Sequence, residues 1–215
     1  MKKENISNSV IRRLPRYYRF LGDLLASGID KISSKELSQR MNLTASQIRQ
    51  DLNCFGGFGQ QGYGYNINML HHEIGNIIGI NNPKKVILIG AGHLGCAVAT
   101  HMAFEKRGFK LIGIFDNDQR KIGSVVTGVS ISSMDKLADF CKRDKPEVAI
   151  LCIPKASAQE IADELLNLGI KGFWNFSHYD LRLKNQNVVV ENVHLGDSLM
   201  TLRYKLGALD EETAK

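Results

Sequence analysis

The sequence predicts an α/β protein built from two units, and three observations support this expectation. Residues 1–80 carry short helical patterns and a glycine-rich segment. Residues 84–192 alternate apolar, strand-like runs with helical patterns. Between them, Asn81–Pro83 interrupts both patterns, because Asn and Pro break regular structure. The predicted parts are residues 1–80, residues 81–192 and a C-terminal segment, residues 193–215.

Length and composition exclude several classes of protein. The chain has 215 residues, 43% of them hydrophobic and 23% charged, which is unlike a disordered or collagen-like chain. No run approaches the roughly 18 apolar residues of a membrane-spanning helix. The charged N-terminus lacks the apolar stretch of a secretory signal. The four cysteines form no CxxC pair, which argues against a zinc site or a disulfide scaffold and favours a cytoplasmic protein.

Positive charge is concentrated in the first quarter of the chain. The net charge is +6, and residues 1–55 hold ten Lys or Arg against five Asp or Glu. A basic unit of this kind is typical of proteins that meet a polyanion such as DNA. On charge alone, a solvated surface with spare lysines is an equal alternative.

Two adjacent capped helices predict a helix-turn-helix in the first unit. Ser33 and Glu36 form a capping box, in which a hydroxyl and a carboxylate satisfy backbone N–H groups at the start of a helix. Thr44 and Gln47 repeat this pattern at the start of the next helix. Two short helices in such close succession are typical of a helix-turn-helix.

The second of these helices has a polar face that suits DNA recognition. At 100° per residue, Ile48 and Leu52 fall on one side, and a polar set falls roughly opposite. The polar set consists of Ser46, Arg49, Gln50 and Asn53. Because Arg pairs with guanine and Gln or Asn pairs with adenine, this face predicts readout of base edges. A merely solvated helix face is the alternative.

A glycine-rich segment after this helix predicts a β-hairpin. Five glycines lie between residues 56 and 64, which is too many for a helix. Tyr63 and Tyr65 favour strands, and residues 60–62 can form the turn. A hairpin directly after a recognition helix is the wing of a winged-helix domain, which contacts the DNA backbone or minor groove. Gln60 is neutral, so its phosphate contact would be weaker than that of a lysine or arginine.

The second unit begins with the pattern of a dinucleotide-binding fold. Lys85–Ile89 has the pattern of a buried strand, and Gly90–Gly95 follows as a GxGxxG that opens a helix over residues 94–104. The next strand, residues 110–115, ends at Asp116, 21 residues after the last glycine. A lone GxGxxG is weak, but this order of strand, loop, helix, strand and acid is what the fingerprint requires.

The residues of this pattern have separate physical roles. Gly90 makes the tight turn, Gly92 lets a pyrophosphate approach the backbone, and Gly95 allows close packing of helix on strand. The helix N-terminus supplies free N–H groups and partial positive charge. Asp116 would accept hydrogen bonds from the ribose and repel a 2′-phosphate, which favours NAD(H) over NADP(H). Pro154 closes a later strand at the edge where the nicotinamide half binds. A nucleotide-free core is the alternative.

The remainder of the chain continues the alternation. The predicted helices are residues 133–143 and 156–168, and the predicted strands are residues 147–153, 172–176 and 188–190. A final helix carries Leu195, Leu199, Leu202 and Leu206 on one face. Because that face has no apolar partner at the chain end, we expect it to pack in a dimer.

No arrangement of residues predicts catalysis. The six histidines are scattered without a metal-ligand spacing such as HExxH. A helix-turn-helix stands where a dehydrogenase would need its substrate domain. We therefore predict a protein that is not an enzyme and has no metal site. An NAD-dependent oxidoreductase with an unusual N-terminal domain is the rival interpretation.

A winged helix joined to an NAD-type Rossmann domain in this length resembles the Rex family of bacterial redox-sensing transcriptional repressors. The resemblance runs nearly end to end, from Arg13–Tyr17 to the last helix. Its most specific stretches are Gln47–Leu52, Phe55–Tyr65, Gly90–Gly95, Ile153–Gln159 and Trp174–Phe176.

The resemblance implies a homodimer that binds inverted-repeat operator DNA, exchanges its C-terminal helix between subunits and senses the NADH/NAD+ ratio, with NADH releasing the DNA. No chemistry on the cofactor is implied. The residues expected to bind the cofactor are Gly90, Ala91, Gly92, His93, Leu94, Gly95, Asp116, Asn117, Pro154 and His101. The residues expected to bind DNA are Arg12, Arg13, Arg16, Ser46, Gln47, Arg49, Gln50, Gln60 and Tyr63.

The sequence departs from the family pattern near the implied switch. His101 occupies a position that is usually Tyr, and His194 one that is usually Asp. In relatives this pair, with an arginine that matches Arg19, connects the nicotinamide state to domain rotation. If the two histidines meet across the dimer, the switch would depend on pH. The alternative is sequence drift that leaves the switch intact or produces a repressor with a weak or absent NADH response.

Overall fold

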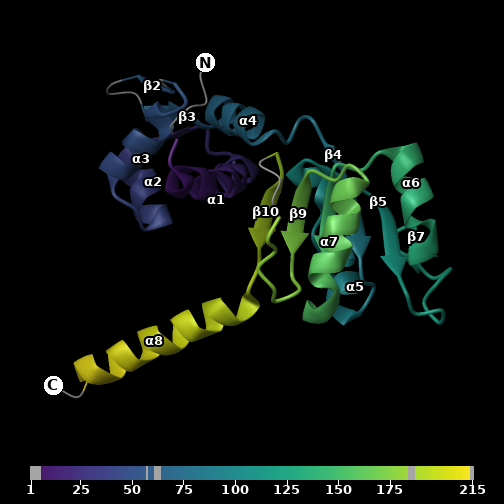
Figure 1. The fold of residues 1–215 in the computed structure, drawn as a ribbon. Helices are drawn as coiled ribbons and strands as arrows, with labels where there is room; N and C mark the ends of the chain where they lie inside the picture. The colour runs from purple at the N-terminus through teal and green to yellow at the C-terminus, as the bar shows by residue number, and fades with distance from the viewer. Residues whose placement is uncertain (1–5, 57, 61–63, 184–186, 214–215) are drawn as a thin grey trace. The chain divides into compact units, whose positions relative to one another are not determined.

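The chain folds into two compact units, Met1–Asn82 and Pro83–Lys215 (Figure 1). The structure, a computed structural model, describes residues 6–56, 58–60, 64–183 and 187–213. The break between the units falls between Asn82 and Pro83, and the second compact unit includes the C-terminal segment, residues 193–215. Each unit has its own hydrophobic core.

The first unit is mainly helical, with a small antiparallel sheet. Its helices are α1 (Asn8–Ala26), α2 (Ser34–Met41), α3 (Ala45–Asn53) and α4 (Ile67–Ile78), and its strands are β1 (Lys31–Ile32), β2 (Gly59–Gln60) and β3 (Gly64–Asn66). The strands pair in the order β1-β3-β2. The strands of the predicted hairpin are therefore confirmed as β2 and β3. Tyr63 and most of the predicted turn lie outside the described residues.

Only one of the two predicted capping boxes is complete. The Ser33 hydroxyl accepts the Glu36 N–H at 3.1 Å, and the Glu36 carboxylate accepts the Ser33 N–H at 2.9 Å, so the box at α2 is confirmed. The Thr44 hydroxyl accepts the Gln47 N–H at 3.1 Å. The Gln47 side chain, however, donates to Asp51 instead of returning to the start of α3, so the second box is wrong in its reciprocal half.

The second unit is a parallel sheet with helices on both faces. Its strands are β4 (Lys84–Ile89), β5 (Phe109–Asp116), β6 (Val125–Val126), β7 (Val129–Ser133), β8 (Val148–Leu151), β9 (Gly172–Asn175) and β10 (Val189–Asn192). Its α-helices are α5 (His93–His101), α6 (Leu137–Asp144), α7 (Ala158–Asn167) and α8 (Leu195–Thr213), with 3-10 turns at Phe104–Arg107, Met134–Lys136 and Lys155–Ser157. The strand order is β10-β9-β8-β4-β5-β7-β6, and only β6 pairs antiparallel.

Alternation along the central strand assigns the helices to the two faces of this sheet. Ile87 and Ile89 pack with residues of α6 and α7 in one cluster. Val86 and Leu88 point the other way and pack with residues of α5. From the end of β4 the chain crosses to β5 on one side, and β8 lies on the other side. The predicted glycine loop therefore sits at the topological switch point, where such folds bind ligands.

Three details of this unit differ from the sequence prediction. The strands β6 and β7 were not predicted. The helix α5 ends at His101 and not at residue 104, because Ala103 adopts a left-handed backbone with φ of 42°. The helix α6 begins at Leu137 and not at residue 133, because Ser133 still pairs in β7 and its hydroxyl caps Asp135.

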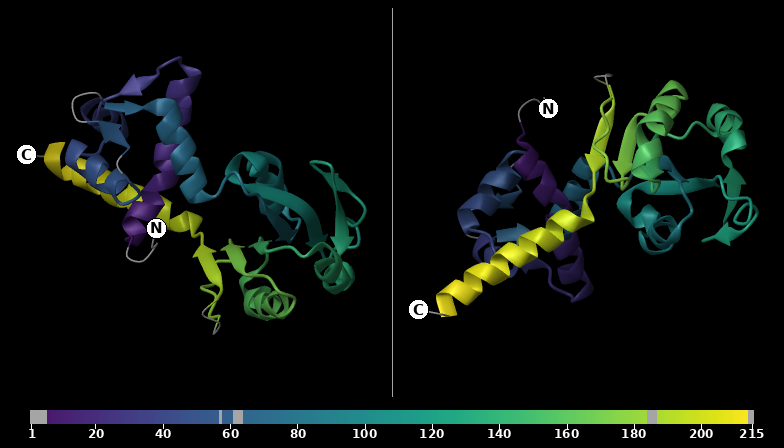
Figure 2. Two further views of the ribbon diagram at one scale, coloured as in Figure 1. Left: turned by 90° about the horizontal axis from the view of Figure 1, so that it is seen from above. Right: turned by 60° about the horizontal axis from the view of Figure 1, so that its bottom comes forward.

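A buried amide fixes the end of the sheet that leads to α8. Asn175, at the end of β9, donates to the Asn192 side chain at 2.8 Å and to the Tyr179 carbonyl. The side-chain oxygen Oδ1 of Asn175 accepts from the Ser177 hydroxyl at 2.6 Å. After β10 the chain continues into α8, a single uninterrupted helix (Figure 2). From Leu195 to residue 209 every residue except Gly207 is exposed, including six leucines or methionines and one tyrosine.

Candidate functional sites

The outer face of α3 forms an open hollow with the polar residues that the sequence placed there. Ile48 and Leu52 are buried in the core of the first unit, so the opposite side of α3 is turned outward. The hollow has a volume of about 550 Å³ and is lined by Ser46, Arg49, Gln50, Asn53 and Cys54. The Arg49 guanidinium donates to the Ser34 hydroxyl at 3.0 Å, so the first residue of α2 helps to orient it.

Behind this face, the carboxylate of Asp51 joins α3 to α1. Both oxygens accept from the Arg13 guanidinium, at 2.6 and 2.8 Å. The Tyr17 hydroxyl donates to the carboxylate at 2.8 Å, and the Gln47 amide donates at 2.9 Å. The Asp51 side chain is 0% exposed. Burial alone would raise its pKa, but these donors outweigh burial and hold the pKa below its ordinary value.

The arginines that the sequence assigned to DNA therefore differ in their surroundings. Arg13 is half-buried against Asp51, and this contact raises its pKa further. Arg16 donates to the Met41 carbonyl at the end of α2. Arg12 is exposed on α1, as is Arg19, which the resemblance assigns to the switch and not to DNA. The assignment of Arg13 and Gln47 to DNA stays a prediction. In the structure both side chains donate hydrogen bonds to Asp51.

The glycine loop between β4 and α5 is packed so closely that two of its glycines have no room for a side chain. A Cβ on Gly95 would lie 1.9 Å from the Gly90 carbonyl oxygen, and a Cβ on Gly90, at φ of 94°, would lie 2.4 Å from the Cys152 carbonyl oxygen. A Cβ on Gly92 would meet no protein atom within 4 Å. The loop is thus pressed against its own helix and sheet, while its middle glycine borders open space. This shape fits a pyrophosphate lying on the backbone.

A cavity of about 390 Å³ lies beside this loop, at the carboxyl ends of β4, β5 and β8. It is lined by Ile89, Gly90, Gly92, Asp116, Asn117, Lys121, Met134, Cys152, Ile153, Pro154 and Ile161. Five of the ten predicted cofactor residues, Gly90, Gly92, Asp116, Asn117 and Pro154, therefore line one cavity. Ala91 and Gly95 support it from behind, since the Ala91 N–H donates to Asp116 and Gly95 packs on Gly90.

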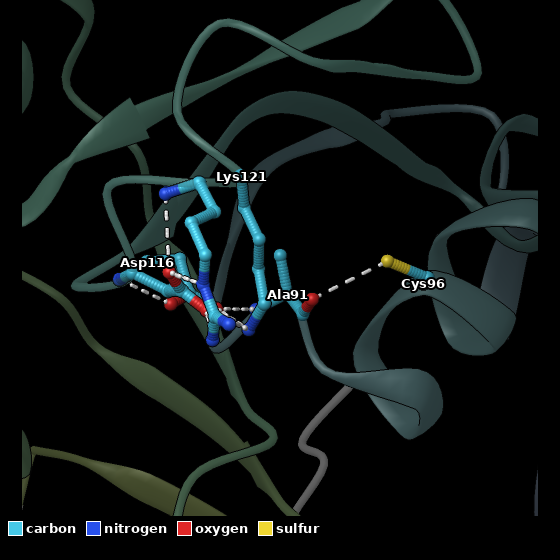
Figure 3. A network of polar contacts seen from close by, with 6 residues as sticks. Ala91, Cys96, Asp116 and Lys121 are labelled. Carbon is cyan, nitrogen blue, oxygen red and sulfur yellow. Dashed lines mark hydrogen bonds and ion pairs between the residues drawn. The ribbon is translucent and has the colours of Figure 1, made fainter.

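The carboxylate of Asp116 is held at the end of β5 by three donors (Figure 3). Oδ2 accepts from the Ala91 N–H at 2.7 Å and from Lys121 Nζ at 3.0 Å. Oδ1 accepts from the Asp118 N–H at 2.8 Å. Burial would raise the pKa of Asp116, but the three donors outweigh burial and lower it. A carboxylate that stays ionised and aimed in this way can accept hydrogen bonds from a ribose.

The predicted histidines are not among the residues that line this cavity. His93 and Leu94 are exposed in the first turn of α5, and His101 is exposed at the far end of the same nine-residue helix. At 1.5 Å per residue, His101 lies about 12 Å along the helix from its start. His194 Nε2 lies 2.9 Å from an Asp180 carboxylate oxygen. The cofactor contact of His101 and its meeting with His194 stay predictions.

The sequence analysis missed two residues that organise these sites, Lys121 and Asp51. Lys121 comes five residues after Asp116, in the loop after β5, and a cation so close to the ribose-binding acid was a usable signal. Asp51 lies between Ile48 and Leu52 on the apolar face of α3. A carboxylate on such a face needs buried donors, which was also a usable signal.

Another cavity of the second unit lies at the opposite edge of the sheet. It has a volume of about 490 Å³ and is bordered by Phe104, Phe109 and Trp174, with Lys84 at the start of β4 and Lys171 just before β9. It lacks the glycine loop, so we do not assign the nucleotide to it. Within the described part of the chain, no helix is long and apolar enough to cross a membrane. The same part holds no cluster of His, Cys, Asp or Glu suited to a metal ion.

Two protein-family models match the chain, one in each unit. Residues 5–53 match the model described as "Putative DNA-binding protein N-terminus", and residues 81–179 match the model described as "CoA binding domain". A curated relative from Clostridium botulinum (strain Hall), named "Redox-sensing transcriptional repressor Rex", is 51% identical over 201 residues. That match covers 94% of this chain and 95% of the relative.

Solved structures match over the same extent. The crystal structure of the protein RSP in complex with β-NAD+ and operator DNA matches with a TM-score of 0.90 at 49% identity, covering 98% of this chain and 97% of that chain. The crystal structure of RSP in complex with β-NADH also matches with a TM-score of 0.90, at 46% identity, covering 99% of this chain and 100% of that chain. Both units of the chain therefore have counterparts in a single known protein.

Proposed function

The chain belongs to the Rex family of redox-sensing transcriptional repressors, and from this membership we propose that it binds operator DNA and leaves it when NADH is bound. The observation that carries the proposal is that one chain combines the polar hollow on α3 with a glycine-loop cavity that ends at Asp116. If NADH and NAD+ favour different states of the protein, DNA affinity then follows the NADH/NAD+ ratio.

The DNA-binding half of the proposal rests on α3. Arg49 and Gln50 are exposed on the hollow, where they can donate to guanine and pair with adenine. Arg12 and Arg16, with Gln60 of the wing, would contact phosphates and give a salt-dependent affinity. Arg13, Gln47 and Asp51 would act differently, by holding α3 against α1 so that the recognition face keeps its orientation.

The cofactor half rests on the shape and charge of the glycine-loop cavity. The loop leaves open space at Gly92, and Asp116 presents an ionised carboxylate at the ribose end. Asn117 and Pro154 would complete the walls, and the first turn of α5 would face the pyrophosphate. When bound, the cofactor supplies its own redox state as the signal. We expect no turnover, because the described residues form two units, proposed here to bind DNA and the coenzyme, and include no third unit for a second substrate.

We propose that the protein works as a homodimer joined through α8. Its large apolar side chains are 47% exposed or more, and they are Leu195, Leu199, Met200, Leu202, Tyr204, Leu206 and Leu209. Seven large apolar side chains exposed along one helix are typical of a surface that packs against another protein. A second copy that supplies the same helix would cover it and would match the two-fold symmetry of an inverted-repeat operator.

The histidines at the implied switch raise the question of whether the NADH response of this protein depends on pH. His194 faces Asp180 at 2.9 Å, and its ring lies 6.1 Å from that of His178. A protonated His194 would form an ion pair with Asp180 and would meet a second imidazole nearby. Operator affinity measured with NADH at about pH 6 and pH 8 tests whether this cluster matters. An unchanged NADH effect rules out the pH-dependent switch.

The proposal is tested by anisotropy of a labelled inverted-repeat duplex, with NAD+ or NADH present. We expect tight binding with NAD+ and release by NADH. Binding that ignores both coenzymes would indicate a repressor without an NADH response. Turnover of NADH with small carbonyl compounds, without DNA binding, would favour the oxidoreductase instead.

Substitution of Arg49 tests which helix reads the DNA. Arg49→Ala should cost about 1–3 kcal/mol of operator binding and relax sequence discrimination. Arg120→Ala removes the same charge from the second unit and serves as the matched control. Full operator affinity in Arg49→Ala would contradict the assignment of α3.

A further inference from the structure

The ribose end of the cofactor cavity holds a cation as well as the expected acid. Lys121 Nζ lies 3.0 Å from Asp116 Oδ2 (Figure 3). Both residues line the cavity. The Lys121 side chain is 36% exposed, so its ammonium is open to solvent and to a ligand. An ammonium has three donors, and the contact with Asp116 uses one of them. The cavity therefore offers a donor and a positive charge beside the carboxylate.

The neighbouring cation does not share this position. Arg120 turns back onto Asp118, with Nε 2.9 Å from Oδ1 and Nη2 2.8 Å from Oδ2. Its side chain is 89% exposed, and it is not among the residues that border the cavity. Two adjacent cations thus occupy the same loop, and Lys121 faces the nucleotide site while Arg120 faces away. This contrast supplies a matched control of equal charge.

The pairing changes the electrostatics of coenzyme selection. A lone carboxylate at the end of β5 accepts the ribose hydroxyls and repels a 2′-phosphate. At Asp116 that repulsion is opposed by the Lys121 ammonium at 3.0 Å, so the net charge of this pair is zero. A second carboxylate, Asp118, lies 4.0 Å from the same ammonium, and its charge is balanced by Arg120 at 2.8 Å. The 2′-phosphate of NADP(H) carries nearly two negative charges and would be attracted by Lys121 over the same short distance at which Asp116 repels it.

Building on the NAD(H) binding proposed above, we propose that Lys121 is a specificity-determining residue that moderates the rejection of NADP(H) by Asp116. NADH binding depends mainly on Asp116, which keeps the Ala91 and Asp118 N–H donors when Lys121 is absent. NADPH binding depends in addition on the Lys121 charge. The wild-type protein should consequently bind NADPH more weakly than NADH, but at a measurable level.

The test is calorimetric titration of NADH and NADPH into the full-length protein and its variants. In Lys121→Met we expect NADPH to bind about tenfold more weakly and NADH to change less than about threefold, since one charge contact is lost for the phosphate alone. Lys121→Arg should restore NADPH binding toward wild type. Arg120→Met should leave both affinities at wild-type values.

A second measurement needs no variant, and so does not depend on whether Lys121→Met folds. In the wild-type protein, NADPH and NADH affinities should show nearly the same salt dependence, because screening weakens the attraction by Lys121 and the repulsion by Asp116 together. A rise of NADPH affinity relative to NADH with increasing salt, as an unopposed carboxylate would produce, or no NADPH binding at about 1 mM, would overturn the inference.

The outcomes separate this inference from the proposed function. If the wild type binds neither coenzyme, both fail. If NADH binds normally but Lys121→Met weakens NADPH no more than Arg120→Met does, the role of Lys121 is refuted and the repressor proposal stands.

Discussion

Two aspartates, one in each unit, are both surrounded by donors but differ in how much acceptor capacity remains. Asp51 accepts two hydrogen bonds at each oxygen, and its side chain is 0% exposed. Among the described residues, Asp116 accepts two at Oδ2 and one at Oδ1, and its side chain is 11% exposed beside a cavity. A carboxylate has about four acceptor positions, so Asp51 is filled and Asp116 retains one.

The difference distinguishes a carboxylate that holds the fold from one that can hold a ligand. In both, burial would raise the pKa and the surrounding donors lower it instead. The direction of the pKa shift therefore does not separate the two roles. The unused acceptor position and the adjoining cavity do, and four predictions test this distinction.

The largest effect is expected for removal of the filled carboxylate. Asp51→Ala leaves the Arg13 charge half-buried without its partner and should lower the free energy of unfolding of the first unit by about 3 kcal/mol. Urea unfolding followed by far-UV circular dichroism measures this loss. Trp174, the single tryptophan, lies in the second unit, and its fluorescence transition should stay unchanged. A loss no greater than in Asp118→Ala would contradict the structural role.

The second effect is on binding and not on folding. Asp116→Ala removes the ribose acceptor and should weaken NADH about 30-fold, as expected for a hydrogen bond to a charged group. Fluorescence titration of NADH measures the affinity, and the urea transition of the first unit should not move. If NADH affinity were unchanged while stability collapsed, the roles of the two aspartates would be reversed.

A smaller effect is expected when Asp51 loses one of its four hydrogen bonds. Tyr17→Phe deletes a buried hydroxyl that donates at 2.8 Å and should cost about 1.5 kcal/mol of stability. Tyr18→Phe makes the same change one residue later, at a ring that stacks on His71, and should cost less. Equal losses in the two variants would show that the Tyr17 hydroxyl contributes nothing particular to the network.

The smallest effect is expected from mild acid. The pKa of Asp51 is lowered in the folded protein, so its contribution is complete above the unfolded value of about 3.9 and is lost as pH falls through the lower native value. The contribution of Asp51 to the free energy of unfolding of the first unit should be constant between about pH 5 and 7 and should decrease below about pH 4. Asp51→Asn should remove that part of the acid dependence, and a wild-type decline beginning near neutrality would point to other groups.

The sequence was most informative where local pattern and tertiary structure agree. The run from Val86 to Ile89 is apolar on both sides because β4 is buried between two layers, and the first and last glycines of the motif after it are dictated by backbone contacts too short for any side chain. The box at Ser33 is equally local, since its two partners lie three residues apart. Such features need no knowledge of distant residues.

The sequence was least informative where a partner comes from far along the chain. Gln47 fits a capping box, but its amide goes to Asp51, which is fixed by Arg13 38 residues earlier in the chain. The strand β7 is short and contains three serines, so it has no apolar run, and pairing with β5 is what makes it a strand. Lys121 gains its role only because the loop after β5 turns back toward Asp116.

The exposure of α8 links the folding of this protein to its concentration. A helix whose described residues, 195–209, are almost all exposed is marginal in water, because most helical stability in proteins comes from tertiary burial. Dilution should therefore unfold α8 before it unfolds either unit. At higher concentration, association of two copies should refold α8 by mass action. The concentration of the protein in the cell would then determine the fraction of molecules in which α8 is folded and paired, whichever coenzyme is bound.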